Sequence, residues 1–84
     1  MEKENQPSME EAFGDVLRTY RKSYGLTQSN LAKASGLSKN FISFCERGQQ
    51  LPNVNSLFLI SYALRISPAQ FIEEVHKKAP RPNR

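Results

Sequence analysis

The sequence predicts an all-α fold in which five short helices form one compact domain. The chain has 84 residues, which is enough for a single domain. Residues that cap helices recur along it, and each is followed by apolar residues that return every three or four positions, the spacing of one helix face. No segment shows the alternation of apolar and polar residues that marks a half-buried strand.

The first helix is expected to begin at Ser8 and to end at Gly25. Ser8 and Glu11 have the spacing of a capping box, in which each side chain binds a backbone N–H of the other residue. Gly25 can adopt the positive φ that ends many helices. The apolar residues between these two ends recur at helical spacing: Phe13, Val16, Leu17 and Tyr20.

The second and third helices are short and follow each other closely. Thr27 is expected to cap the second helix, which ends at Gly36. Ser38 is expected to cap the third helix, which runs to Arg47 and stops before Gly48. Only a tight turn therefore joins the two helices.

The fourth and fifth helices both have a proline at their start. The fourth opens at Pro52-Asn53, and Ser67 caps the fifth, where Pro68 occupies the first helical position and its missing N–H costs nothing. The fifth helix continues to Ala79. We expect the chain to divide into a flexible N-terminal arm, a domain and a basic C-terminal tail: residues 1–7, 8–79 and 80–84.

The charge of the chain is concentrated in its middle. The whole sequence holds 12 Lys and Arg against 8 Asp and Glu, a net charge of +4, whereas residues 18–65 hold seven bases and one acid, Glu46. A basic region of this kind favours a polyanionic partner such as nucleic acid. Charge alone leaves open the simpler interpretation of a well-solvated surface.

Several functional classes lack the residues they need. With one histidine, His76, and one cysteine, Cys45, the sequence predicts no disulfide framework, no metal site and no cofactor. It also has no glycine-rich phosphate loop and no spaced carboxylate pair, which argues against an enzyme. The longest mostly apolar stretch, residues 57–64, is far shorter than the about 20 residues that span a bilayer. Because the chain also has a single cysteine, we expect a soluble, cytoplasmic protein.

The segment from Gln28 to Arg47 carries the functional prediction. Gly36 permits the abrupt change of direction between its two helices, and the small Ala32 lets them approach closely. Ile42 and Cys45, three residues apart, give the third helix a narrow inner stripe, and we expect Cys45 to be a core residue. The rest of that helix is mostly polar and directed outward, as the major groove of DNA requires.

This pattern resembles the lambda-repressor-like helix-turn-helix regulators, also called the Cro/cI-type or XRE family. The resemblance covers roughly residues 13–75. Three residues depart from the usual pattern: Asn30 replaces a common glutamate, Phe44 a polar residue and Cys45 a larger aliphatic one. The motifs that match stand in order along the chain: Leu26-Thr27-Gln28, Leu31-Ala32, Gly36-Leu37-Ser38, Ile42-Ser43, Glu46-Arg47-Gly48, Pro52-Asn53, Leu57 and Ala63-Leu64.

The resemblance implies that the outward side of the third helix contacts bases. Lys39, Asn40 and Phe44 match the family's base-contacting positions, and Ser43 is placed to reach a base or a phosphate. The chemistry agrees, because lysine suits the acceptors of guanine, asparagine pairs with adenine, and a phenylalanine ring contacts the methyl group of thymine.

Other residues are expected to contact the DNA backbone or to hold the domain together. Backbone contacts are expected from Gln28, Arg47, Gln49 and Gln50. The family places an internal ion pair at the positions of Arg21 and Glu46, with direct DNA contact as the alternative for Arg21. Phe41 either packs on its own domain or assists at the DNA backbone.

One recognition helix distinguishes only a few base pairs, so a two-fold dimer on a palindromic operator is expected. We predict an interface on the fifth helix that includes one residue of the fourth: Phe58, Phe71, Ile72 and Val75. The alternative is that the three residues of the fifth helix close the domain's own core.

The sequence thus favours a homodimeric repressor or autoregulatory controller that binds double-stranded DNA and has no small-molecule effector. The alternative is an antitoxin, which sequesters a partner protein and binds DNA secondarily.

Overall fold

The computed structural model describes residues 7–79, so the expected arm and tail lie outside the described part except for Pro7. In that part the chain forms five α-helices and no strand. The structure confirms the expected all-α fold and the order of its helices: α1 (Met9–Ser23), α2 (Gln28–Ser35), α3 (Lys39–Glu46), α4 (Val54–Ala63) and α5 (Pro68–Lys78).

Each helix begins at the capping residue that the sequence indicates. At α1 the Ser8 hydroxyl accepts from the Glu11 N–H and the Glu11 carboxylate accepts from the Ser8 N–H, both at 3.0 Å. At α2 the side chain of Asn30 performs the same reciprocal role for Thr27, so the shorter amide replaces the usual glutamate. The side chains of Ser38, Asn53 and Ser67 cap the remaining three helices.

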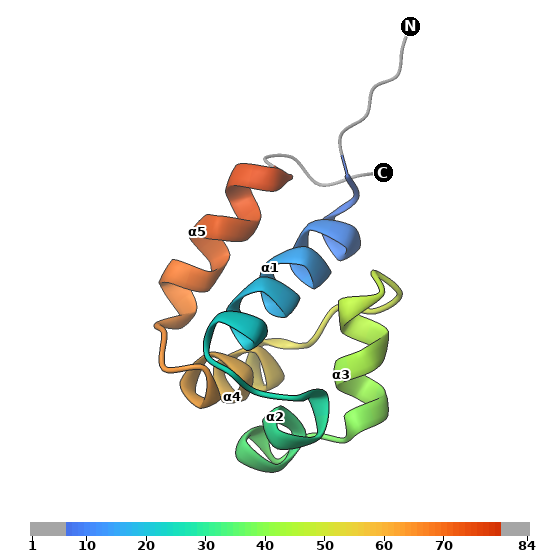
Figure 1. Ribbon diagram of the computed structural model, residues 1–84. Helices are drawn as coiled ribbons and strands as arrows, with labels where there is room; N and C mark the ends of the chain where they lie inside the picture. The colour runs from blue at the N-terminus through green and yellow to red at the C-terminus, as the bar shows by residue number, and fades with distance from the viewer. Residues whose placement is uncertain (1–6, 80–84) are drawn as a thin grey trace, which may run out of the picture.

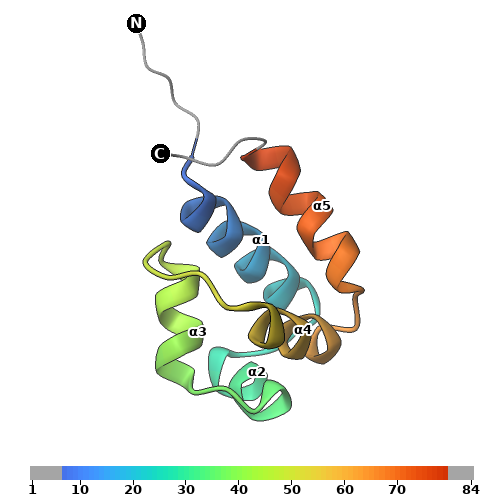
Figure 2. The same cartoon turned by 180° about the vertical axis from the view of Figure 1, so that it is seen from behind.

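Helix α1 forms the centre of the bundle. It runs between α5 on one side and α3 on the other, while α2 and α4 close one end (Figure 1). The view from behind shows the same order (Figure 2). The core contains apolar residues from all five helices, and its largest fully buried side chain is Phe71.

Two residues that the sequence assigned to a dimer interface lie in the core instead. Phe71 is 0% exposed, and its ring centroid lies 4.8 Å from that of Phe13 on α1; Val75 is 4% exposed. Both residues therefore belong to the chain's own core and have almost no surface to offer a second copy. The expected interface is corrected at these two positions, whereas Ile72 and Phe58 remain exposed.

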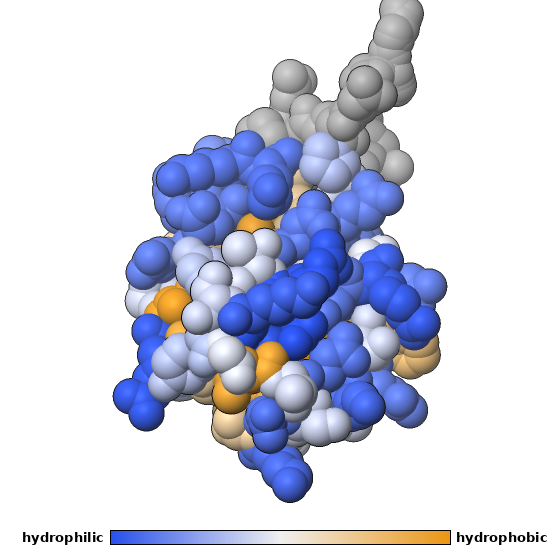
Figure 3. Space-filling view, in the orientation of Figure 1, coloured by the Kyte–Doolittle hydropathy of each residue, from blue (hydrophilic) through white to orange (hydrophobic). Residues whose placement is uncertain are grey.

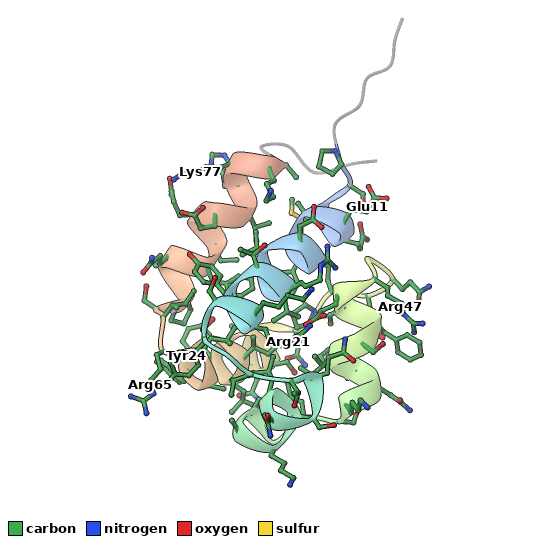
Figure 4. All side chains as sticks on the ribbon, in the orientation of Figure 1. Glu11, Arg21, Tyr24, Arg47, Arg65 and Lys77 are labelled. Atoms are coloured by element: carbon green, nitrogen blue, oxygen red, sulfur yellow. The ribbon has the colours of Figure 1, made fainter. Side chains whose placement is uncertain are left out.

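Helix α4 ends without the glycine that ends α2. Arg65, two residues after its last residue, adopts a positive φ of 64°, a conformation that costs a side chain other than glycine some strain. Its guanidinium carbon lies 6.0 Å from the centroid of the Tyr24 ring, a contact that joins the α4–α5 connection to the end of α1 (Figure 4). The sequence carried no signal for this contact.

Gly14 allows α1 and α3 to cross closely. A Cβ atom at this position would lie 2.5 Å from the carbonyl oxygen of Cys45 and 2.7 Å from that of Glu46. These oxygens belong to the backbone at the end of α3, which cannot move aside as a flexible side chain can. Gly14 is thus required at the contact that positions the end of α3, although glycine inside a helix is unfavourable by about 1 kcal/mol.

Cys45 lies in the core next to this crossing and is fully buried. Burial disfavours the thiolate, and the nearby Glu46 carboxylate adds to the effect, so the pKa of the thiol rises from 9.0 to about 11. The thiol therefore stays protonated at neutral pH, as expected for a structural cysteine.

We predict that Gly14→Ala destabilises the domain, although helix propensity alone would favour alanine by about 1 kcal/mol. The added methyl group must push α3 away from α1, and overpacking of this kind costs about 1–3 kcal/mol. Chemical denaturation measures the change in the free energy of unfolding. Thr19→Ala, at an exposed position of the same helix, is the control and should be neutral or slightly stabilising. Equal effects of the two substitutions would contradict the close crossing.

We also predict that Cys45 makes stability depend on alkaline pH. The folded-state pKa is the higher one, so the stabilisation is fully present below about pH 9 and is lost as the pH rises toward 11. A shift of two units corresponds to about 2–3 kcal/mol. Denaturation at pH values across this range should show the loss in the wild type and not in Cys45→Ala. Parallel curves for the two proteins would contradict the prediction.

Candidate nucleic-acid interface

The turn between α2 and α3 sets the angle between the two helices. Gly36 has a φ of 76°, and its N–H donates to the Ala32 carbonyl at 2.9 Å. The Leu37 N–H donates to the same carbonyl at 3.2 Å, which closes the end of α2. Ala32 itself is 8% exposed, where α2 packs against α3. This is the geometry of a helix-turn-helix.

A buried ion pair holds the end of α3 against α1. Nε and Nη2 of Arg21 donate to the two carboxylate oxygens of Glu46 at 2.5 and 3.0 Å, and the two side chains are only 10% and 3% exposed. The hydrogen bond to Glu46 raises the pKa of Arg21, against the opposing effect of burial, so the guanidinium remains charged. The structure thus places Arg21 inside the domain, between α1 and α3 (Figure 4).

Two further side chains complete what we call the Glu46 cluster, which comprises Arg18, Arg21, Gln28 and Glu46. Nε2 of Gln28, the first residue of α2, donates to Oε1 of Glu46 at 3.0 Å. Nη1 of Arg18 donates to the Glu46 backbone carbonyl at 2.9 Å, while its Nη2 pairs with Asp15 at 2.6 Å. Sequence reasoning missed both contacts, because nothing local to residues 18 and 28 indicates that they meet residue 46.

The outward face of α3 presents the residues expected to contact bases. Lys39 and Asn40 are exposed, Phe44 is 40% exposed, and Ser43 is half-buried. Phe41 is half-buried and packs against the core, which agrees with the first of its two proposed roles. This face therefore combines hydrogen-bonding groups with one exposed aromatic ring.

Arg47 is the C-cap residue directly after α3 and lies over this aromatic ring. Its guanidinium carbon is 5.1 Å from the centroid of Phe44, within the range of a cation–π contact. Arg47 points away from the body of the domain (Figure 4), and Gln49 and Gln50 in the following loop are also exposed. The expected backbone-contacting residues after α3 thus lie next to the expected base-contacting ones.

The surface of α2 and α3 is positively charged. Lys33, Lys39 and Arg47 are exposed, whereas the only acid between residues 28 and 47, Glu46, is 5% exposed and paired. The space-filling view shows strongly hydrophilic residues over α1 and toward α3, with hydrophobic residues in small separate spots (Figure 3). Such a surface suits a polyanion, because the charges that it exposes are basic.

The described residues offer little for other kinds of site. In the range 7–79, no three His, Cys, Asp or Glu side chains come close enough together to hold a metal ion. None of the five helices there combines the length and apolar character needed to cross a membrane.

Comparisons with known proteins agree with this geometry. A helix-turn-helix family model matches residues 17–71. The chain is 31% identical over 64 residues to an uncharacterised HTH-type transcriptional regulator, y4dJ, of Sinorhizobium fredii, covering 76% of this chain and 83% of that protein. Two longer relatives are the HTH-type transcriptional regulators SinR of Bacillus subtilis and DicA of Escherichia coli, 32% and 36% identical, and the chain spans only 60% and 52% of their length.

Solved structures show the same fold. The clp gene regulator ClgR of Corynebacterium glutamicum superimposes with a TM-score of 0.82 at 33% identity, covering 90% of this chain and 97% of that one. The restriction-modification controller protein C.AhdI of Aeromonas hydrophila gives a TM-score of 0.72 at 34% identity, covering 74% and 94%. The chain therefore belongs to the lambda-repressor-like, XRE-type helix-turn-helix family, a family of non-enzymatic DNA-binding transcriptional regulators.

Proposed function

We propose that this protein is a sequence-specific transcriptional regulator that inserts α3 into the major groove of double-stranded DNA. The outward face of α3 carries this proposal, because it bears exposed lysine and asparagine side chains and no exposed acid. Lys39 faces the acceptors of guanine and Asn40 pairs with adenine, while Ser43 and Phe44 complete the contact with bases. The Glu46 cluster holds this face rigidly, so little freedom is lost on binding.

Contacts to the DNA backbone flank α3 on both sides. The first turn of α2 supplies backbone N–H groups at a helix N-terminus, where phosphate binds well. One of the two side-chain N–H groups of Gln28 donates to Glu46, which holds the side chain at this turn, and the second N–H is the proposed donor to a phosphate oxygen. Gln49 and Gln50 are exposed after α3 and supply donors on the other side.

A homodimer doubles the number of base pairs read, and α4 offers a surface for it. Val54, Phe58 and Tyr62 are four residues apart, so they form one stripe along the helix, with exposures of 70%, 42% and 63%. Phe58 and Tyr62 contact each other edge to face, and Ile72 on the adjacent α5 is 47% exposed. Apolar residues gathered on a surface mark an interaction site.

The partner proposed for this α4 stripe is a second copy of the chain on a palindromic operator. Such a dimer requires its two α3 helices to meet half-sites about 34 Å apart, one turn of DNA. One similar structure is that of a restriction-modification controller, which supports a repressor or autoregulatory controller that acts in the cytoplasm at the nucleoid. An antitoxin would use the same stripe to bind a different protein, and the oligomeric state distinguishes the two functions.

We predict that base preference depends on Lys39 and Asn40. Selection from random DNA should yield one preferred site, and Asn40→Ala or Lys39→Ala should each relax the preference at one position per half-site, at a cost of about 1–3 kcal/mol. Lys78→Ala, an exposed residue on α5, serves as the control and should leave the preference unchanged. Circular dichroism confirms that the variants fold. Unchanged preference in both α3 variants would refute their assignment, and failure to select any site would refute the function itself.

We further predict that the α4 stripe forms the dimer. Phe58→Asp with Tyr62→Asp should convert a dimer to a monomer in sedimentation equilibrium and weaken operator binding, because two charges cannot be buried in an apolar interface. Thr19→Asp with Ser23→Asp, at exposed positions of α1, adds the same charge outside the stripe and should leave the dimer intact. A dimer that persists in the first variant places the interface elsewhere. A wild type that stays monomeric even on the operator refutes the homodimer.

A further inference from the structure

We propose that Phe44 and Arg47 together recognise a pyrimidine–guanine step whose pyrimidine carries a 5-methyl group, so that thymine and 5-methylcytosine are bound alike. This inference rests on the proposed function, since it requires α3 to lie in the major groove. It also reassigns Arg47, which the sequence placed at the DNA backbone, to contact with a base.

The spacing of residues puts Arg47 in line with the base-contacting positions. Asn40, Phe44 and Arg47 are separated by four and three residues, so they share one face of α3. Side chains on a helix lean toward its N-terminus. The contact of the Arg47 guanidinium with the Phe44 ring, at 5.1 Å, agrees with this direction and holds the charge over the outward face.

Arg47 also differs from the two arginines of α1 in whether a carboxylate is bound to its guanidinium. Arg18 is paired with Asp15, and Arg21 is paired with Glu46. Within residues 7–79 no carboxylate forms an ion pair with Arg47. Its planar donors are therefore available to a ligand, while the ring of Phe44 restricts their orientation in advance.

The chemistry of this pair suits two adjacent groups in the major groove. A guanidinium donates two parallel hydrogen bonds to O6 and N7 of guanine. The preceding base on the same strand stacks about 3.4 Å away, so a methyl group on its C5 atom lies beside the guanidinium plane and the phenyl ring. Thymine and 5-methylcytosine both carry this methyl group, whereas uracil and cytosine carry hydrogen there.

The pair therefore distinguishes pyrimidines by their methyl group. An operator that contains a cytosine–guanine step at this position would be bound weakly when unmethylated, and methylation at C5 of the cytosine would strengthen binding. The expected gain for one methyl group removed from water is about three- to fivefold in affinity.

The test uses the operator obtained by selection from random DNA, with single substitutions at the step that α3 contacts. Two pairs of duplexes differ by one methyl group each: thymine against uracil, and 5-methylcytosine against cytosine. Fluorescence anisotropy should show tighter binding to the methylated member of both pairs, by about three- to fivefold. Phe44→Ala should remove both differences while the base preference set by Asn40 remains, and Arg47→Lys should weaken the preference for guanine.

Lys78→Gln removes an exposed charge from α5 and is the control for the loss of charge. This variant should still bind the methylated member of both pairs more tightly. Equal binding within both pairs, on an operator that the wild type binds specifically, overturns this inference and leaves the proposed function standing. A selected operator with no pyrimidine–guanine step in its half-sites also overturns it, as does a methyl effect that survives Phe44→Ala. A selection that yields no preferred site instead refutes the proposed function.

Discussion

The rest of the structure depends on the hydrogen bonds that Glu46 accepts and the ion pair that it forms at the end of α3. Its carboxylate accepts from Arg21 of α1 and from Gln28 of α2, while the backbone carbonyl of the same residue accepts from Arg18. Three helices thus meet at the last residue of α3. Removing one member of a buried ion pair costs about 3–5 kcal/mol, because the other charge is left without a partner. Loss of DNA binding in an Arg21 variant would consequently reflect lost geometry of α3.

The same residue type has two different roles in this domain. The guanidinium groups of Arg18 and Arg21 are bound to groups at the end of α3, so their charges are satisfied internally. That of Arg47 is exposed, lies over the aromatic ring of Phe44 and forms no ion pair with a carboxylate of the described residues. The positive charge that α2, α3 and the residue after α3 offer to DNA is therefore that of three exposed side chains, Lys33, Lys39 and Arg47.

The spacing of apolar residues predicts the helices well, but it does not predict whether an apolar face is covered by the same chain or left for another molecule. The spacing of Phe71 and Val75 correctly indicates an apolar face on α5, yet both residues are buried in the core of the same chain, where Phe71 contacts Phe13 of α1. Conversely, α4 is apolar on nearly every side, and nothing in its sequence indicates that Val54 and Tyr62 are left exposed beside Phe58. Only the packing of neighbouring helices decides which apolar residues are left for a partner.

The sequence by itself determined the five helices, the turn at Gly36 and the residues on the outward face of α3, because caps, positive-φ glycines and helical spacing act over a few residues. Only the tertiary structure decided that Gly14 meets backbone carbonyls of α3, that Gln28 and Arg18 join the Glu46 cluster, and that Arg47 stacks on Phe44. The first three of these contacts join residues 18 to 32 positions apart in the sequence. The contact between Arg47 and Phe44 is local, but it depends on the rotamers that the packed helix leaves free. Their geometry arises from how the helices cross, which no local pattern encodes.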